Sequence, residues 1–123
     1  MTNEPPNIKE EVLLLHAQIC NGLADPNRIL LIYSLADGPH TVNELAKVVD
    51  LPQSTVSRHL KVLRDRNIVR ATRDAQSVIY SLADERIIQA LDLLRTVMAD
   101  GLRGRAALAD SLSNPQSAGV IDQ

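Results

Sequence analysis

The stretch that decides the fold is LPQSTVSRHLKVLRDRNIV, residues 51–69, which has the pattern of an amphipathic helix. Val56, Leu60 and Leu63 recur at i, i+4 and i+7, so they would form one apolar stripe facing a core. The rest of the first turns carries short hydroxyl, amide and cationic side chains. A solvated helix face usually carries Glu, Lys and Ala, because these residues lose little side-chain entropy in a helix. This face is therefore expected to contact a ligand.

Two helices are expected before residue 40. The segment 8–24 has the apolar spacing of a helix on more than one side. Asp25 is a good N-cap, and Pro26 suits the first position of a second helix. That helix is expected to end at the breaker Asp-Gly-Pro, residues 37–39.

A short helix is expected between this breaker and the opening stretch. Thr41 and Glu44 have the spacing of a capping box, in which each side chain bonds the backbone N–H of the other residue. Pro52 then starts the next helix, and Asn67 can end it in the left-handed conformation. Residues 41–67 are therefore predicted to form two helices joined by a tight turn.

Two short β-branched runs follow. IVRATR, residues 68–73, and SVIYSL, residues 77–82, alternate in the manner of strands. Asp74-Ala75-Gln76 lies between them, so the two runs are expected to pair as a β-hairpin. A helix-turn-helix over 41–67 followed by a wing over 68–82 is the order of a winged helix-turn-helix, which is a mainly α fold with a small β-hairpin.

The two ends of the chain are predicted to hold helices that associate. The last helix is expected over residues 84–109, with Asp84 as its N-cap. This helix and the first, residues 8–24, are apolar over a wider arc than one small domain can cover, which favours a homodimer formed through the terminal helices. Residues 1–7 and 110–123 are expected to be disordered because of their polar, proline-containing composition.

The composition excludes several classes of protein. The single cysteine among 123 residues rules out a disulfide framework and indicates the cytoplasm. The start MTNEPPN is not a secretory signal, and the apolar runs are only about four residues long, so no membrane span is expected. No Ser/His/Asp order, paired carboxylates or metal-ligand set indicates an enzyme.

Positive charge is concentrated around the opening stretch. The whole chain has 13 Lys and Arg against 15 Asp and Glu, a net charge of −2. Between residues 53 and 73, however, the basic residues Arg58, Lys61, Arg64, Arg66, Arg70 and Arg73 face one acid, Asp65. The distribution of charge matters more for nucleic-acid binding than its sum, so a local basic patch is expected here.

A face of this chemistry fits double-stranded DNA. In a winged helix-turn-helix the second helix of the pair enters the major groove. Gln can pair with adenine and Arg with guanine, while Ser and Thr reach either bases or phosphates. Ser54, Ser57, Arg58 and Lys61 would point away from the apolar stripe, with Gln53 at its edge near the helix start. The alternative is that the hydroxyl residues serve only to begin the helix.

Four pieces of the sequence together resemble a known family: LADPNRILLIYSL (23–35), TVNELA (41–46), QSTVSRHLKVLRDRNIV (53–69) and VIYSL (78–82). They resemble the ArsR/SmtB-type winged-helix repressors, and the likeness covers roughly residues 20–82. That family consists of homodimeric bacterial and archaeal repressors that release operator DNA on binding metal ions or after another chemical signal. The resemblance implies a sequence-specific repressor on an inverted-repeat operator.

The resemblance also implies which residues contact DNA. The residues at the family's DNA-reading positions in the helix and in the wing are Gln53, Ser54, Thr55, Ser57, Arg58, Arg73, Gln76 and Ser77. The helical face adds Lys61 to this set. The alternative function is a winged-helix protein-interaction module without sequence-specific DNA binding, and the basic, hydroxyl-rich face argues against it.

The sensing motifs of the family are absent. Residues 45–48 hold no thiol where metal-sensing members place Cys-x-Cys, and residues 84–110 hold no His where others place ligands. His16 and Cys20, spaced i, i+4, could bind a soft metal from one helix face, but two ligands are too few. Alternatively they are a core cysteine and a partly buried histidine. No metal or cofactor is predicted, and this pair is the candidate sensing site for a small-molecule or redox effector.

Overall fold

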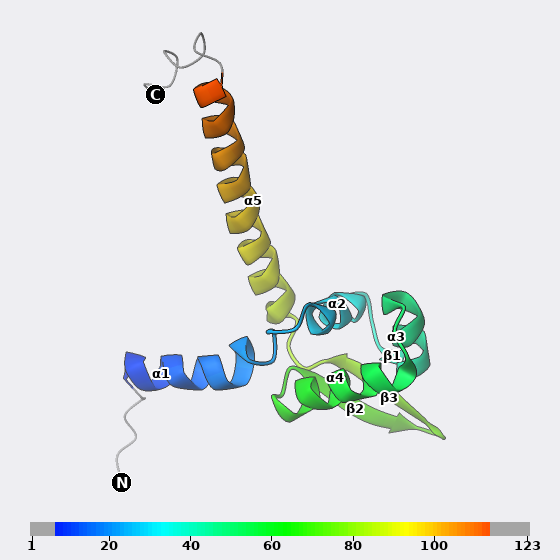
Figure 1. Ribbon diagram of the computed structural model, residues 1–123. Helices are drawn as coiled ribbons and strands as arrows, with labels where there is room; N and C mark the ends of the chain where they lie inside the picture. Colours follow the sequence, from blue (N-terminus) through cyan, green and yellow to red (C-terminus); the bar gives the residue numbers. More distant parts are fainter. Residues whose placement is uncertain (1–6, 114–123) are drawn as a thin grey trace. The chain divides into compact units, whose positions relative to one another are not determined.

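The computed structural model describes residues 7–113 (Figure 1). Its elements are α1 (Ile8–Leu15), the π-helical turn η1 (His16–Cys20), α2 (Pro26–Ser34), β1 (His40–Thr41), α3 (Val42–Val49), α4 (Gln53–Asp65), β2 (Val69–Asp74), β3 (Ser77–Leu82) and α5 (Arg86–Ser113). The described residues divide into two compact units, one ending at Ile88 and the other beginning at Gln89. The boundary between the two units falls within α5. None of the described helices is long and apolar enough to cross a membrane.

The core of the first unit is built around the apolar stripe of α4. Val56, Leu60 and Leu63 are fully buried, as their spacing predicted. The helices α2, α3 and α4 contact one another, and α4 also contacts β2. The other buried apolar side chains of this unit are Leu31, Ile32, Leu35, Leu45, Ile68 and Val69. Shortening a buried Leu to Ala in such a core costs about 2–5 kcal/mol, so this stripe sets the rotation of α4 firmly.

The helices α3 and α4 form the predicted helix-turn-helix. The capping box is present, since the Thr41 N–H donates to Glu44 Oε1 at 2.8 Å and the Glu44 N–H donates to Thr41 Oγ1 at 3.2 Å. The bond from the Thr41 backbone also holds the pKa of the Glu44 carboxyl below its usual value. Asp50 ends α3 in the left-handed conformation with a φ of 56°. Asn67 follows α4 with a φ of 60°, as predicted.

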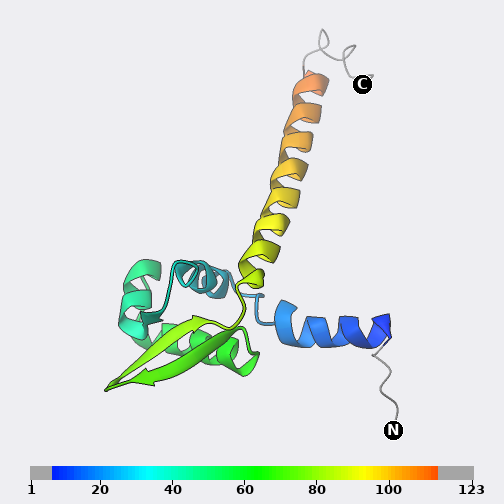
Figure 2. The ribbon, with the colours of Figure 1, turned by 180° about the vertical axis from the view of Figure 1, so that it is seen from behind.

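The wing belongs to a three-stranded antiparallel sheet with strand order β1-β3-β2. Figure 2 shows the hairpin projecting from the first unit. Its register pairs Asp74 with Ser77, so the first strand covers 69–74 rather than the expected 68–73. The strand β1 was not expected, because two residues are too few to show alternation. It forms where the chain entering α3 pairs with the other edge of β3.

The first helix is interrupted, whereas one helix was expected over residues 8–24. It leaves α-helical geometry after Leu15, and in the following π-helical turn the Asn21 N–H donates to the His16 carbonyl at 2.9 Å. Apolar spacing does not distinguish an α-turn from a π-turn, so the sequence held no signal for this change. Asp25 then caps α2 as predicted, accepting a bond from the Asn27 N–H at 2.8 Å.

The described ends of the chain extend beyond the predicted helices. Asn7, expected in a disordered segment, is the N-cap of α1. The helix α5 continues to Ser113 instead of ending near residue 109, because Leu112 extends its apolar spacing from Leu108. Asp84 accepts a bond from the Arg86 N–H at 2.9 Å, which is the geometry of the predicted N-cap. The rest of both predicted disordered segments lies outside the described residues.

The hairpin loop offers a test of its backbone conformation. Ala75 has a φ of 56°, a left-handed conformation that costs a residue with a Cβ roughly 1–2 kcal/mol. Ala75→Gly removes that cost but increases the entropy of the unfolded chain, so we expect the free energy of unfolding to rise by about 0.5–1 kcal/mol. The same change at Ala71, in the extended strand β2, should lower it. Urea unfolding measures both, and a destabilised Ala75→Gly protein would contradict the expectation.

Candidate nucleic-acid interface

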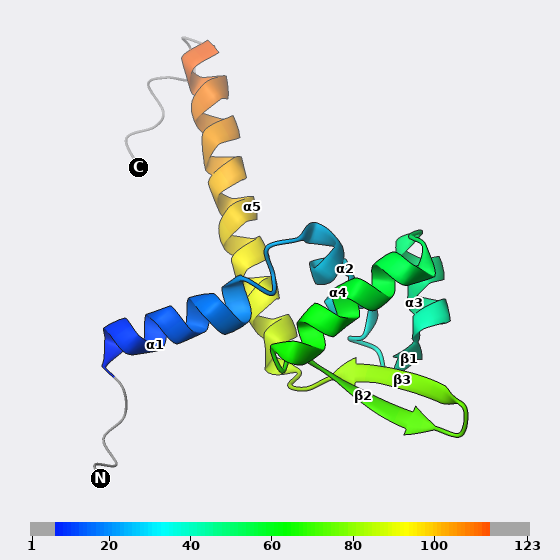
Figure 3. The same cartoon turned by 60° about the horizontal axis from the view of Figure 1, so that its bottom comes forward.

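One face of α4 carries four of the nine predicted contact residues. Ser54, Ser57, Arg58 and Lys61 are spaced i, i+3, i+4 and i+7, which places them side by side on the helix. All four are exposed, because the buried stripe of the same helix holds this face outward. The face therefore offers two hydroxyls and two cations to a partner. Figure 3 shows α4 beside the β2–β3 hairpin, with which it packs through β2.

The N-terminus of α4 is open to an anion. Pro52 is its N-cap, and none of the described side chains caps the helix by a hydrogen bond. The first backbone N–H groups of a helix have no partner within it, and they carry the positive end of the helix dipole. A phosphate oxygen would satisfy both features. The exposed Gln53 side chain lies at this same end of the helix.

A groove lined by uncharged side chains lies between the helix-turn-helix and the wing. It has a volume of about 260 Å³ and is lined by Thr41, Val42, Asn43, Gln53, Gln76, Ser77 and Val78. The structure thus brings together three predicted residues from α4 and the hairpin. The lining residues are uncharged, so the groove offers hydrogen bonds from amides and hydroxyls rather than charge. Such groups can donate to phosphate oxygens, and the Gln53 amide can also pair with the edge of a base.

Two predicted residues lie elsewhere. Arg73 is exposed on β2, where its register partner is Val78. Thr55 is half-buried and lies outside the i, i+3, i+4, i+7 spacing of the exposed face. Its position is therefore less accessible than that of the neighbouring Ser54.

Lys61 is already paired within the chain. Its Nζ donates to Asp65 Oδ2 at 2.8 Å, one turn along the same helix. This hydrogen bond holds the pKa of the Asp65 carboxyl below its usual value, so the acid is ionised at neutral pH. Both side chains are more than half exposed, and water screens the pair strongly. An anionic ligand could therefore compete with Asp65 for Lys61.

Sequence reasoning did not select Asn43 or Thr41 as contact residues, although both line the groove. Thr41 was assigned only its capping role, and Asn43 lies inside the capping box. The available signal was that a capping box places its inner residues in the exposed first turn of a helix. Thr41 and Asn43 lie beside the wing because β1 pairs with β3, and the sequence did not predict this pairing.

The candidate sensing residues His16 and Cys20 lie in η1, and both are exposed in the single chain. Their exposure contradicts the alternative that they are core residues of this chain. Among residues 7–113, no group of three or more His, Cys, Asp or Glu is arranged to hold a metal ion.

Comparison with known proteins places this geometry in one family. The family model described as "Bacterial regulatory protein, arsR family" matches residues 25–71. The nodulation protein NolR of Rhizobium meliloti is 35% identical over 96 residues, which cover 78% of each chain. The HTH-type transcriptional regulator NmtR of Mycobacterium tuberculosis is 38% identical over 76 residues, covering 62% of this chain and 63% of NmtR. The crystal structure of NolR from Sinorhizobium fredii superposes with a TM-score of 0.66 at 34% identity, covering 79% of this chain and 96% of that one. The chain therefore belongs to the ArsR family of bacterial regulatory proteins.

Proposed function

We propose that this protein is a sequence-specific transcriptional repressor that binds an inverted-repeat operator as a homodimer. The observation that carries the proposal is the exposed α4 face of Ser54, Ser57, Arg58 and Lys61, which continues into the amide-lined groove at Gln53. Hydroxyls, amides and an Arg on a helix of this kind match the base edges and phosphates of a major groove. The relative NmtR is named as a transcriptional regulator, which agrees with this role.

Each part of the interface has a distinct proposed role. Arg58 and Gln53 read base edges, because Arg pairs bidentately with guanine and Gln with adenine. Ser54, Thr55, Ser57 and Lys61 contact bases or phosphates along the same helix. The wing residues Arg73, Gln76 and Ser77 contact the backbone beside the reading helix, and their contribution is independent of sequence.

The homodimer is proposed to form through α1 and α5. In α1, the side chains of Val12, Leu13, Leu14 and Leu15 are half or more exposed. The large apolar side chains of α5 that are more than half exposed are Leu93, Leu94, Val97, Met98, Leu102, Leu108 and Leu112. Monomeric proteins rarely expose contiguous apolar surface on this scale, so a second copy of the chain is the proposed cover.

The inducing signal is proposed to differ from the usual metal ions of the family. The α3 segment 45–48 lacks thiols, and residues 84–110 lack His, so the ligands of both well-known metal sites are missing. The exposed Cys20 and His16 are the candidate residues for a small-molecule or redox effector. Modification in η1 would act close to the proposed dimer helix α1.

The interaction-module alternative is separated from the repressor by binding to DNA alone. A repressor must shift some duplex in a salt-dependent manner, whereas an interaction module must not. The operator can be isolated by selection from a random duplex pool, with fluorescence anisotropy as the measurement. Failure to bind any selected or random duplex would favour the interaction module.

Substitutions should separate base reading from positioning. Arg58→Ala and Gln53→Ala should each cost about 1–3 kcal/mol on the selected operator and relax its sequence preference. Arg73→Ala should weaken operator and random DNA by similar factors and reduce the salt slope by about one unit. Anisotropy titrations over a range of salt concentrations measure all three. If Arg58→Ala weakened both duplexes equally, its assigned role would be wrong.

Removing the acid beside Lys61 should strengthen binding without changing specificity. Asp65→Asn releases Lys61 from its ion pair, so we expect higher affinity for operator and random DNA alike and a salt slope steeper by about one unit. Asp100→Asn, which removes the acid paired with Arg103 on α5, makes the same charge change on a helix other than α4. We expect Asp100→Asn to raise the affinity and the salt slope less than Asp65→Asn does. An unchanged salt slope for Asp65→Asn would show that Lys61 does not contact phosphate.

The dimer is tested by sedimentation. The wild-type protein should sediment as a dimer at micromolar concentration, because α1 and α5 expose extensive apolar surface. Leu94→Glu, within the exposed stripe of α5, should produce monomers that keep the helical circular dichroism signal. Gln89→Glu, at an exposed polar position of the same helix, is the matched control and should stay dimeric. A monomeric wild-type protein would refute the proposed assembly.

A further inference from the structure

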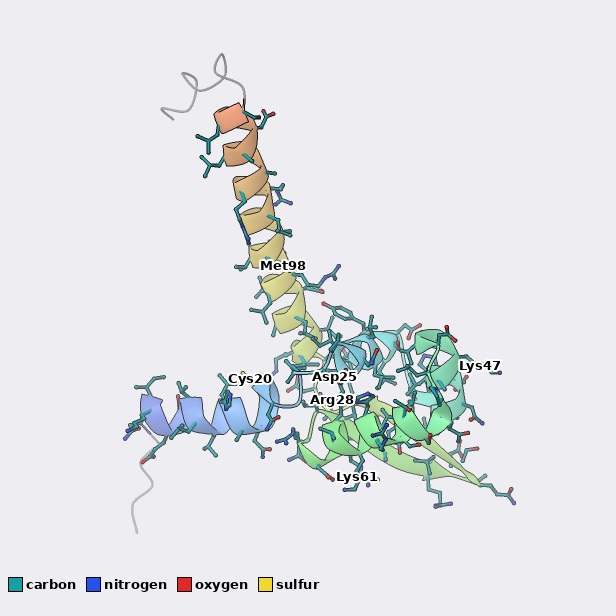
Figure 4. The ribbon with its side chains drawn as sticks, viewed as in Figure 1. Cys20, Asp25, Arg28, Lys47, Lys61 and Met98 are labelled. Carbon is teal, nitrogen blue, oxygen red and sulfur yellow. The ribbon has the colours of Figure 1, made fainter. Side chains whose placement is uncertain are left out.

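Two arginines hold the segment that connects the first helix to α2. Arg28, on α2, donates from Nε to the Gly22 carbonyl at 2.7 Å and from Nη2 to the Asn21 carbonyl at 3.3 Å. Arg66, the C-cap of α4, donates from Nη1 to the Ala17 carbonyl in η1. Figure 4 labels Arg28, which lies between this connecting segment and α4. Guanidinium groups from two helices therefore bind carbonyls at the end of the first helical segment.

Arg28 also contacts the reading helix directly. Its Nη1 lies 3.4 Å from Nδ1 of His59 on α4. A guanidinium can only donate, so Nδ1 is the acceptor in this contact. One side chain thus links the segment after η1 with the middle of α4.

Gly22 lets these parts approach closely. The residue is buried, and a Cβ at this position would lie 2.9 Å from Ile68 Cδ1 and 3.0 Å from Arg66 Cδ. Ile68 is bound in turn to the end of α4, since its N–H donates to the Leu63 carbonyl at 2.9 Å. The connecting segment therefore packs against the place where the reading helix ends and the wing begins.

These polar bonds matter because α1 contributes nothing to the core of its unit. None of its residues is buried, so apolar packing within the chain does not set its direction. The placement of Arg66 at this junction has a desolvation cost, because its Nε is buried without a hydrogen-bond partner in the described structure.

We propose that Arg28 and Arg66 are positioning residues, which hold α4 and the wing at one orientation to α1 and thereby set the half-site spacing that the dimer accepts. This inference rests on the proposed function, in which α1 helps form the dimer. Two reading helices of a dimer must lie about 34 Å apart to enter successive major grooves. A change in the angle between α1 and α4 is transmitted to that separation, and the arginine bonds are the contacts that resist such a change.

The experiment compares operators that differ only in spacing. The selected operator is lengthened or shortened by one or two base pairs at its centre, and a duplex with a single half-site is included. The wild-type dimer should lose roughly tenfold in affinity for each altered base pair, comparable to one mismatch. Arg28→Ala and Arg66→Ala should bind the selected operator more weakly, but lose no more than about threefold on altered spacing. Their affinity for the single half-site should fall by no more than the loss of one basic charge from this patch causes.

Matched variants separate positioning from loss of charge or fold. Arg64→Gln removes an exposed arginine of the same helix, and it should lower affinity by one factor at every spacing. Arg66→Lys can still donate to the Ala17 carbonyl, so it should restore the spacing preference in part. Gly22→Ala pushes the connecting segment away from Ile68 and Arg66, and should reduce the preference without removing any charge.

The outcomes distinguish this inference from the proposed function. Folded Arg28→Ala, Arg66→Ala and Gly22→Ala proteins that keep the full spacing penalty would overturn the positioning role and leave the repressor intact. A wild-type protein that binds the selected DNA without any spacing preference would overturn the inverted-repeat dimer and the positioning role together. Should Arg28→Ala or Arg66→Ala fail to fold, Arg28→Lys, Arg66→Lys and Gly22→Ala provide the same comparison.

Discussion

The burial of Val56, Leu60 and Leu63 is the constraint on which the rest of the first unit depends. Because all three side chains are fully buried, α4 can adopt only one rotation about its axis. A rotation that exposed this stripe would bury Arg58 or Lys61 among apolar side chains, at the cost of an uncompensated charge. The face proposed to read DNA is therefore the face that the core leaves free. Its position is decided by packing before any DNA is present.

Elements with strong local signals could be predicted from the sequence, and elements created by tertiary pairing could not. The apolar stripe of α4, the Thr41–Glu44 capping box and the left-handed Asn67 each depend on residues close together in the chain. In contrast, β1 forms only by pairing with β3, which is distant in the sequence. The groove that Asn43 lines depends on the same pairing. The π-helical turn and the half-burial of Thr55 also escaped prediction, because helical spacing alone does not encode them.

The net charge of −2 does not show that charged and uncharged side chains occupy different parts of the candidate interface. The α4 face offers Arg58 and Lys61, whereas the groove between α4 and the wing is lined by amides and hydroxyls. Charge attracts any phosphate backbone, whereas hydrogen bonds to base edges, such as those proposed for Arg58 and Gln53, discriminate between sequences. The Asp65 carboxylate beside Lys61 limits the attraction that is independent of sequence. A weaker general attraction leaves a larger share of the binding energy to the groups that read bases.

The exposed apolar side chains of α1 and α5 make the behaviour of the protein depend on its concentration in the cell. When association covers such a surface, the stability of the fold increases with protein concentration by mass action. A sparse population is then exposed to proteolysis and aggregation through its uncovered helices, while an abundant one is protected. The degree of repression would then increase more steeply than the rate at which the protein is synthesised. The abundance of the regulator would thus become an input to the circuit alongside any chemical signal.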